Sequence, residues 1–118
     1  MSYYRSETEI ESVVRAFEAC EIDKTEFKHR QHLTVAVWYV QTLGKDAAFD
    51  RMRSGLLTFL DHHGVDRKKY DETITLFWIE LIADKLNELG AGVSLVEKCN
   101  SVVELMGQPA SSQTSISS

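Results

Sequence analysis

The chain has 118 residues, of which 43% are hydrophobic and 26% are charged, and its formal net charge at pH 7 is −5. These values fit one ordinary globular domain with a single core, and the acidic balance argues against a nucleic-acid partner. Because no run approaches the roughly 20 apolar residues of a membrane-spanning helix, and no signal peptide is visible at the N-terminus, we expect a cytoplasmic protein without a membrane partner.

Apolar residues recur at intervals of three and four along most of the chain, which is typical of amphipathic helices. Ser6 and Ser94, each followed three residues later by glutamate, fit the start of a helix, and Gly44, Gly64 and Gly90 fit the ends of the second, third and fourth segments. The predicted helices span about residues 7–21, 26–43, 46–63 and 71–89, and a fifth follows Ser94 to about residue 106.

The fold class predicted from these segments is all-α, a single-domain bundle of four to five helices with short connections. The second segment is apolar nearly all round, so we expect it to be a central helix buried on several sides. In the fourth segment an apolar stripe includes Ile74, Phe77, Trp78 and Leu81, and we expect both of its aromatic residues to lie in the core.

The domain boundary is expected at residue 106. Residues 1–106 form the helical domain, and the Ser/Thr-rich stretch 107–118 is predicted to be a disordered tail without catalytic residues. Cys20 and Cys99 are far apart in the sequence and form no C-x-x-C motif, so we expect two buried or half-buried thiols.

Three places carry polar residues among apolar neighbours. The first is Glu26, His29 and His32 at the start of the second helix, the second is His62-His63 at the end of the third, and the third is the stretch 70–75 at the start of the fourth. In an up-and-down bundle these three places lie at one end, and this convergence predicts a site there.

Two histidines at positions i and i+3 share one helix face, and carboxylates from another helix can complete a divalent-metal site. The predicted ligands are His29, His32, His63 and Asp71, for a metal ion of the zinc, nickel or iron class. A single Glu26-x-x-His29 unit does not favour a di-iron centre, which needs two such units. Such an ion could activate water, and the same residues without metal could serve in acid/base chemistry.

Three of the candidate site residues also have a purely structural explanation. Asp71 can act as an N-cap, Glu72 suits the positive start of a helix, and His63 suits the negative end of one. A hydrogen-bonded cluster of histidine, aspartate and threonine can also exist only to fix the register of the helices.

Two motifs together resemble a family of small uncharacterised bacterial proteins. The residues that carry the resemblance are Phe27-x-His29-x-x-His32-Leu33-x-x-Ala36 and Tyr70-Asp71-Glu72-Thr73-Ile74-Thr75, and it covers about residues 26–82. The family pattern is H-x-x-H-L-x-x-A followed by Y-H-E-T-x-T, so this chain has Asp71 at a position where the family has histidine. The resemblance implies a site but no particular reaction.

The leading hypothesis is a polar site that binds a small molecule, or acts on it, with or without a divalent metal. Glu72 is the candidate catalytic base, the metal ligands are those named above, and Tyr70 and Thr75 support the site by hydrogen bonding. The alternative is a non-catalytic helical interaction module, with a homodimer as one form, whose polar cluster is structural. Whether the protein is an enzyme is left open by the sequence.

Overall fold

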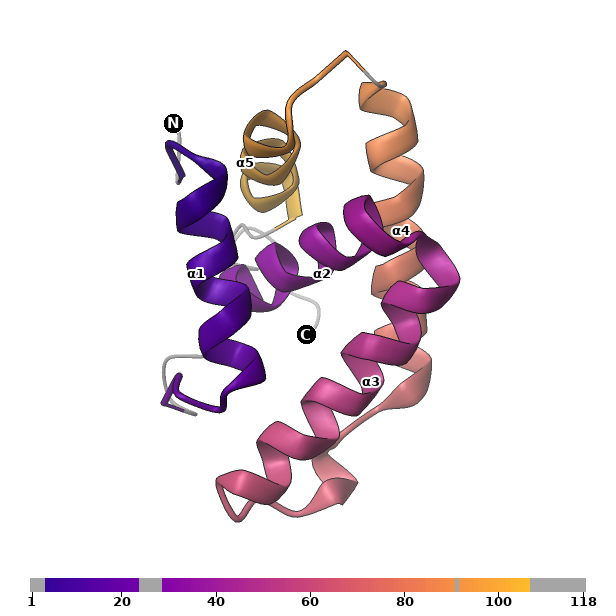
Figure 1. Cartoon of the computed structure of the whole chain (residues 1–118). Coiled ribbons are helices and arrows are strands. Elements are labelled where there is room, and N and C mark those ends of the chain that lie inside the picture. Colours follow the sequence, from indigo (N-terminus) through magenta and orange to yellow (C-terminus); the bar gives the residue numbers. More distant parts are fainter. Residues whose placement is uncertain (1–3, 24–28, 91, 107–118) are drawn as a thin grey trace.

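The computed structural model describes residues 4–23, 29–90 and 92–106, without the side chains of His29 and Met106. This part of the chain folds into α-helices without a strand, which confirms the predicted all-α bundle (Figure 1). The helices are α1 (Glu7–Glu18), α2 (His29–Leu43), α3 (Lys45–His62), α4 (Glu72–Leu89) and α5 (Leu95–Met106), with a short 3₁₀ turn, η1 (Arg67–Lys69), before α4. The predicted tail, 107–118, lies outside the described residues.

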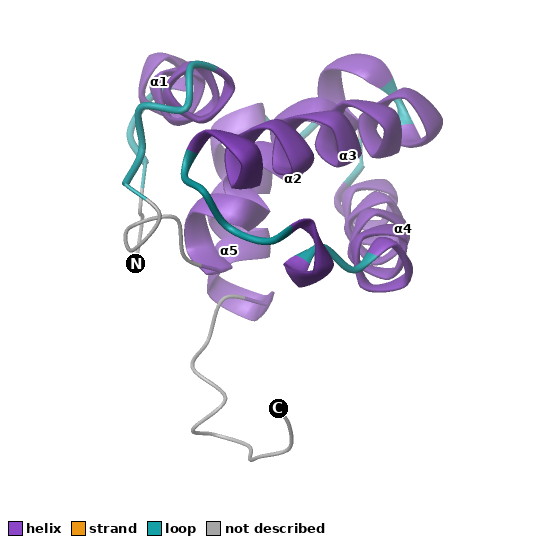
Figure 2. Cartoon of the chain, turned by 90° about the horizontal axis from the view of Figure 1, so that it is seen from below, coloured by secondary structure: helices purple, strands orange, loops and turns teal. Residues whose placement is uncertain are grey.

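Helix α2 is the centre of the bundle, as its apolar sequence predicts. It contacts each of the other four α-helices, and α1 and α4 lie on opposite sides of it (Figure 2). A helix surrounded in this way needs an apolar surface in most directions. Its fully buried residues are Leu33, Thr34, Val35, Ala36, Val37 and Tyr39.

Capping side chains fix where several helices begin. The Ser6 hydroxyl accepts a hydrogen bond from the Glu9 N–H, and the Ser94 hydroxyl accepts one from the Glu97 N–H. These bonds satisfy backbone donors that the first turn of a helix leaves free. Both predicted N-caps are therefore confirmed.

The end of α1 differs from the prediction, which extended this helix to residue 21. Cys20 adopts a left-handed conformation with φ of +58°, and its N–H bonds to the Phe17 carbonyl while the Glu21 N–H bonds to the Ala16 carbonyl. This left-handed residue ends the helix at Glu18 by closing the last carbonyls into a turn. Cys20 and Cys99 are both buried, free thiols, as expected.

Helix α4 is turned about its axis relative to the predicted packing. The residues that it buries are Thr75, Ile79, Ile82 and Leu86, whereas Ile74, Phe77 and Leu81 are 53%, 56% and 36% exposed. The prediction that Phe77 lies in the core is therefore wrong. The sequence of α4 is apolar on two sides, so its periodicity alone does not identify the side that faces the core.

None of the helices in the described part of the chain combines the length and the apolar character that crossing a lipid bilayer requires.

Candidate functional site

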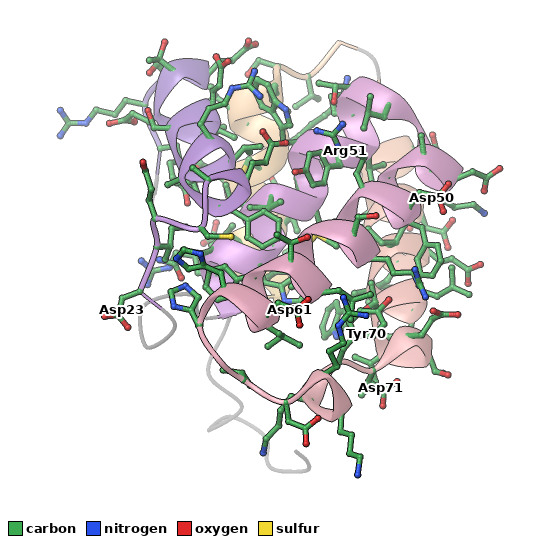
Figure 3. The ribbon with its side chains drawn as sticks, turned by 60° about the horizontal axis from the view of Figure 1, so that its bottom comes forward. Asp23, Asp50, Arg51, Asp61, Tyr70 and Asp71 are labelled. Carbon is green, nitrogen blue, oxygen red and sulfur yellow. The ribbon has the colours of Figure 1, made fainter. Side chains whose placement is uncertain are left out.

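A cavity of about 230 Å³ lies where the starts of α2 and α4 meet the end of α3. Figure 3 shows Tyr70 and Asp71 on the segment that leads into α4, on the same side of the molecule as Asp61 near the end of α3. The cavity therefore brings together residues from two of the three predicted places. Its lining residues are His32, Leu56, Leu60, Lys69, Tyr70, Asp71, Ile74 and Thr75.

A second cavity of about 210 Å³ continues between α2 and α4. It shares His32 and Ile74 with the first, and its other lining residues are Leu33, Ala36, Trp78 and Ile82. Because the two cavities have common walls, we treat them as one hollow and call it the α2–α4 groove. Together they have the volume of an ordinary small-molecule site, which is roughly 300–1,000 Å³.

The hydroxyl of Tyr70 is the most unusual polar group in the groove. It is buried and has no hydrogen-bond partner among the residues that the structure describes. Burial raises the pKa of this phenol above its usual value, and the nearby Thr75 hydroxyl opposes the rise only in part. The Thr75 hydroxyl donates to the Asp71 carbonyl oxygen at 2.9 Å, and its oxygen lies near the Tyr70 phenol without completing a hydrogen bond to it. The Tyr70 O–H can therefore donate to a bound group inside a mainly apolar hollow.

Asp71 and Glu72 lie at the start of α4 and are both exposed. Asp71 is the N-cap of the helix, and its Oδ1 accepts a hydrogen bond from the Ile74 N–H at 3.0 Å. Glu72 does not line the groove, and its Oε1 accepts a hydrogen bond from Arg53 Nε at 2.8 Å. The structure thus gives both carboxylates a structural partner.

His63 lies outside the groove, at the end of α3. Its ring packs against Phe59, with 4.4 Å between the ring centroids, and against His62 at 5.0 Å. Its Nε2 is buried and has no hydrogen-bond partner in the described part of the chain. The structure does not bring His63 to the cavity that holds His32 and Asp71.

His32 is the predicted histidine that lines both parts of the groove. The side chain of His29, one turn earlier on α2, lies outside the described residues, as does Glu26. Among the residues described, no three His, Cys, Asp or Glu side chains are placed to hold a metal ion together. Of the predicted metal ligands, His32 and Asp71 line the same cavity.

Several groove residues were missed by the sequence analysis. Lys69 ends a short basic run directly before Tyr70, which could have marked it, but Leu56 and Leu60 carry no signal beyond helical periodicity. Trp78 was expected in the core, and it packs against the core while also forming one wall of the groove with Ile74.

Comparisons with protein-family models, curated proteins and solved structures found no match to this chain. The resemblance described above therefore rests on its motif residues alone.

Proposed function

We propose that this protein binds a small organic molecule in the α2–α4 groove. The observation that carries the proposal is the buried Tyr70 hydroxyl, which has no partner among the described residues although it lies in a hollow of ligand size. Leaving a buried polar group unpaired costs about 1–3 kcal/mol, which a ligand acceptor would recover. A groove with apolar walls and a few polar groups is the usual form of such a site.

The lining indicates the chemistry of the ligand. Ile74 and Trp78 would contact an apolar body, while the Tyr70 hydroxyl would donate to a polar group at one end. Lys69 lines the same part of the groove and would attract negative charge, while the Asp71 carboxylate in that lining opposes it. An aromatic or alicyclic carboxylate combines these features.

A fluorescence titration with 2-naphthoate tests this proposal. The chain has two tryptophans, and Trp38→Phe leaves Trp78, in the groove wall, as the single reporter. We expect a saturable change in Trp78 emission, because the probe would lie against the indole ring. A change that grows linearly with probe concentration, or no change at all, would contradict binding in the groove.

A reaction in the groove is a further step of the same proposal. His32 would be the proton-transfer group nearest to a bound molecule, and Glu72 is the proposed base. Because Glu72 is exposed and paired with Arg53, it would have to leave this ion pair to act. Binding is therefore the function that the geometry supports best.

We propose separately that His29 and His32 hold a divalent metal ion. Both residues belong to α2, and His32 faces the groove beside Asp71. We expect protein purified without added metal to contain a stoichiometric ion that is lost in both His29→Ala and His32→Ala. Mass spectrometry measures the metal content, and an equally negligible content in the wild type and both variants would exclude a bound ion.

The exposed face of α4 supports a second candidate function, a homodimer. Ile74, Phe77 and Leu81 recur at intervals of three and four, so they form one apolar stripe along the helix. Lys68 and Lys69 precede the helix, and Asp84 lies toward its other end, where Lys85 and Glu88 form an ion pair, so the basic residues and Asp84 are at similar distances from Phe77. An antiparallel pairing with α4 of a second copy would join the stripes and place opposite charges together.

Sedimentation velocity of Phe77→Lys tests this dimer. Phe77 does not line the groove, so the substitution should abolish association without altering ligand binding. Leu105→Lys is the matched control, since Leu105 is 59% exposed but lies on α5. A wild-type protein that is monomeric at its highest soluble concentration would refute the proposed pairing, and so would a dimer that both variants weaken equally.

A further inference from the structure

A separate cavity of about 300 Å³ lies at the junction of α2 and α3, bordered by α4 and α5. Figure 1 shows this junction next to α4. The cavity shares no lining residue with the α2–α4 groove, and its lining is rich in polar side chains. Those that matter for its chemistry are Gln41, Lys45, Asp84, Asn87 and Lys98.

Lys98 places a buried positive charge at this cavity. The residue is 5% exposed, and its Nζ donates to the Gln41 Oε1 at 3.0 Å. It forms no ion pair with any residue in the described part of the chain. An ammonium group has three N–H donors, and a buried charge is costly unless an opposite charge compensates it. The single neutral amide oxygen of Gln41 does not compensate the positive charge of Lys98.

The start of α3 adds a second source of positive potential to the same cavity. Gly44, the N-cap, has a φ of +90° and provides no side-chain hydrogen bond to the first turn. The free N–H groups of a first turn and the helix dipole both favour an anion at this end of a helix. Gly44 and Lys45 line the cavity, so this end of α3 adjoins the same space as the Lys98 ammonium.

We propose that this cavity binds a small oxyanion, the phosphate or carboxylate group of a metabolite. Lys98 is the buried counter-ion, Lys45 adds charge at the rim, and the Asn87 amide can donate a hydrogen bond. The Asp84 carboxylate in the same lining opposes the anion and limits the affinity. This site is independent of the ligand proposed for the α2–α4 groove.

Nuclear magnetic resonance titrations test the site with two probes, inorganic phosphate and acetate, with sodium chloride at matched ionic strength as the blank. We expect saturable shifts of the backbone amides of Lys45 and Asp46 with at least one probe. Lys98→Met, which keeps the apolar stem and removes the charge, should weaken binding by about tenfold or more. Lys68→Met is the matched control and should leave binding unchanged, because Lys68 is exposed and lies outside the cavity.

The probe that saturates identifies the group that is bound, phosphate or carboxylate. Asp84→Asn serves as a second variant and should strengthen binding, because it removes the opposing charge from an exposed residue. The proposal is overturned if neither probe gives saturable shifts, or if Lys98→Met and Lys68→Met bind equally. An unchanged affinity in Asp84→Asn would overturn it even if Lys98→Met failed to fold.

Discussion

Tyr39→Phe should lower the free energy of unfolding by about 1.5–3 kcal/mol, the usual range for a hydrogen bond to a charged group. The Tyr39 side chain is 2% exposed, and its hydroxyl donates to the Glu18 Oε2 at 2.7 Å. The same carboxylate accepts hydrogen bonds from Arg51 at 2.9 Å and from Arg15 at 3.1 Å. This network joins α1, α2 and α3, so the lost hydroxyl leaves a partly buried carboxylate short of one donor. Urea unfolding at pH 7 measures the change.

The effect of pH provides an internal check on that result. Burial would raise the pKa of Glu18, but the hydrogen bonds from Tyr39, Arg51 and Arg15 outweigh it, so the pKa is lowered below its ordinary value of 4.5. A carboxyl group with a lowered pKa in the folded state stabilises the protein above its ordinary pKa, and this stabilisation is lost as the pH falls through the folded value. The difference between wild type and Tyr39→Phe should therefore shrink below about pH 4.5. A difference that is constant down to pH 2 would mean that the hydroxyl acts through packing alone.

Unlike Tyr39→Phe, Tyr70→Phe should leave the free energy of unfolding unchanged or raise it, and it should weaken ligand binding. The substitution removes a buried hydroxyl that has no partner among the described residues, so the unliganded protein should be as stable as wild type or more so. Affinity for 2-naphthoate should fall by about tenfold, because the donor to the carboxylate is gone. Urea unfolding and the Trp78 titration, done on the same preparation, measure both effects.

Thr75→Ser is the control for this experiment. It retains the hydroxyl that donates to the Asp71 carbonyl and alters only a methyl group near Tyr70. Because only one methyl contact with the ligand is lost, we expect a much smaller loss of binding than in Tyr70→Phe. If Tyr70→Phe destabilises the protein as much as Tyr39→Phe does, the Tyr70 hydroxyl has a structural partner and the argument for a ligand fails.

Much of the fold could be predicted because the relevant signals are local. Ser6 and Ser94 begin helices through bonds to residues three positions later, and the apolar run of α2 identifies a central helix whatever surrounds it. The turn that ends α1 at Glu18 depends on the left-handed conformation of Cys20. Since cysteine has no marked preference for that conformation, the sequence carries no warning of it.

The candidate site was predictable only in part, because it depends on how the helices are turned. His32, Tyr70, Asp71 and Thr75 meet in one cavity, as a bundle topology allows. Glu72 instead reaches Arg53 on α3, and His63 packs against Phe59, because the orientation of each helix sets the direction of its side chains. The cavity itself is a property of packing, and no spacing of residues in the sequence encodes its volume.

Intermolecular nuclear Overhauser contacts between bound 2-naphthoate and the labelled protein test the central claim most directly. We expect contacts from the naphthalene ring to the methyl groups of Ile74 and Thr75 and to the indole ring of Trp78, all of which line the α2–α4 groove. We expect none to Phe77, which lies on the outer face of α4. Contacts to Phe77 and Leu81 without contacts to Thr75 would place the probe on the helix surface and contradict a binding site in the groove.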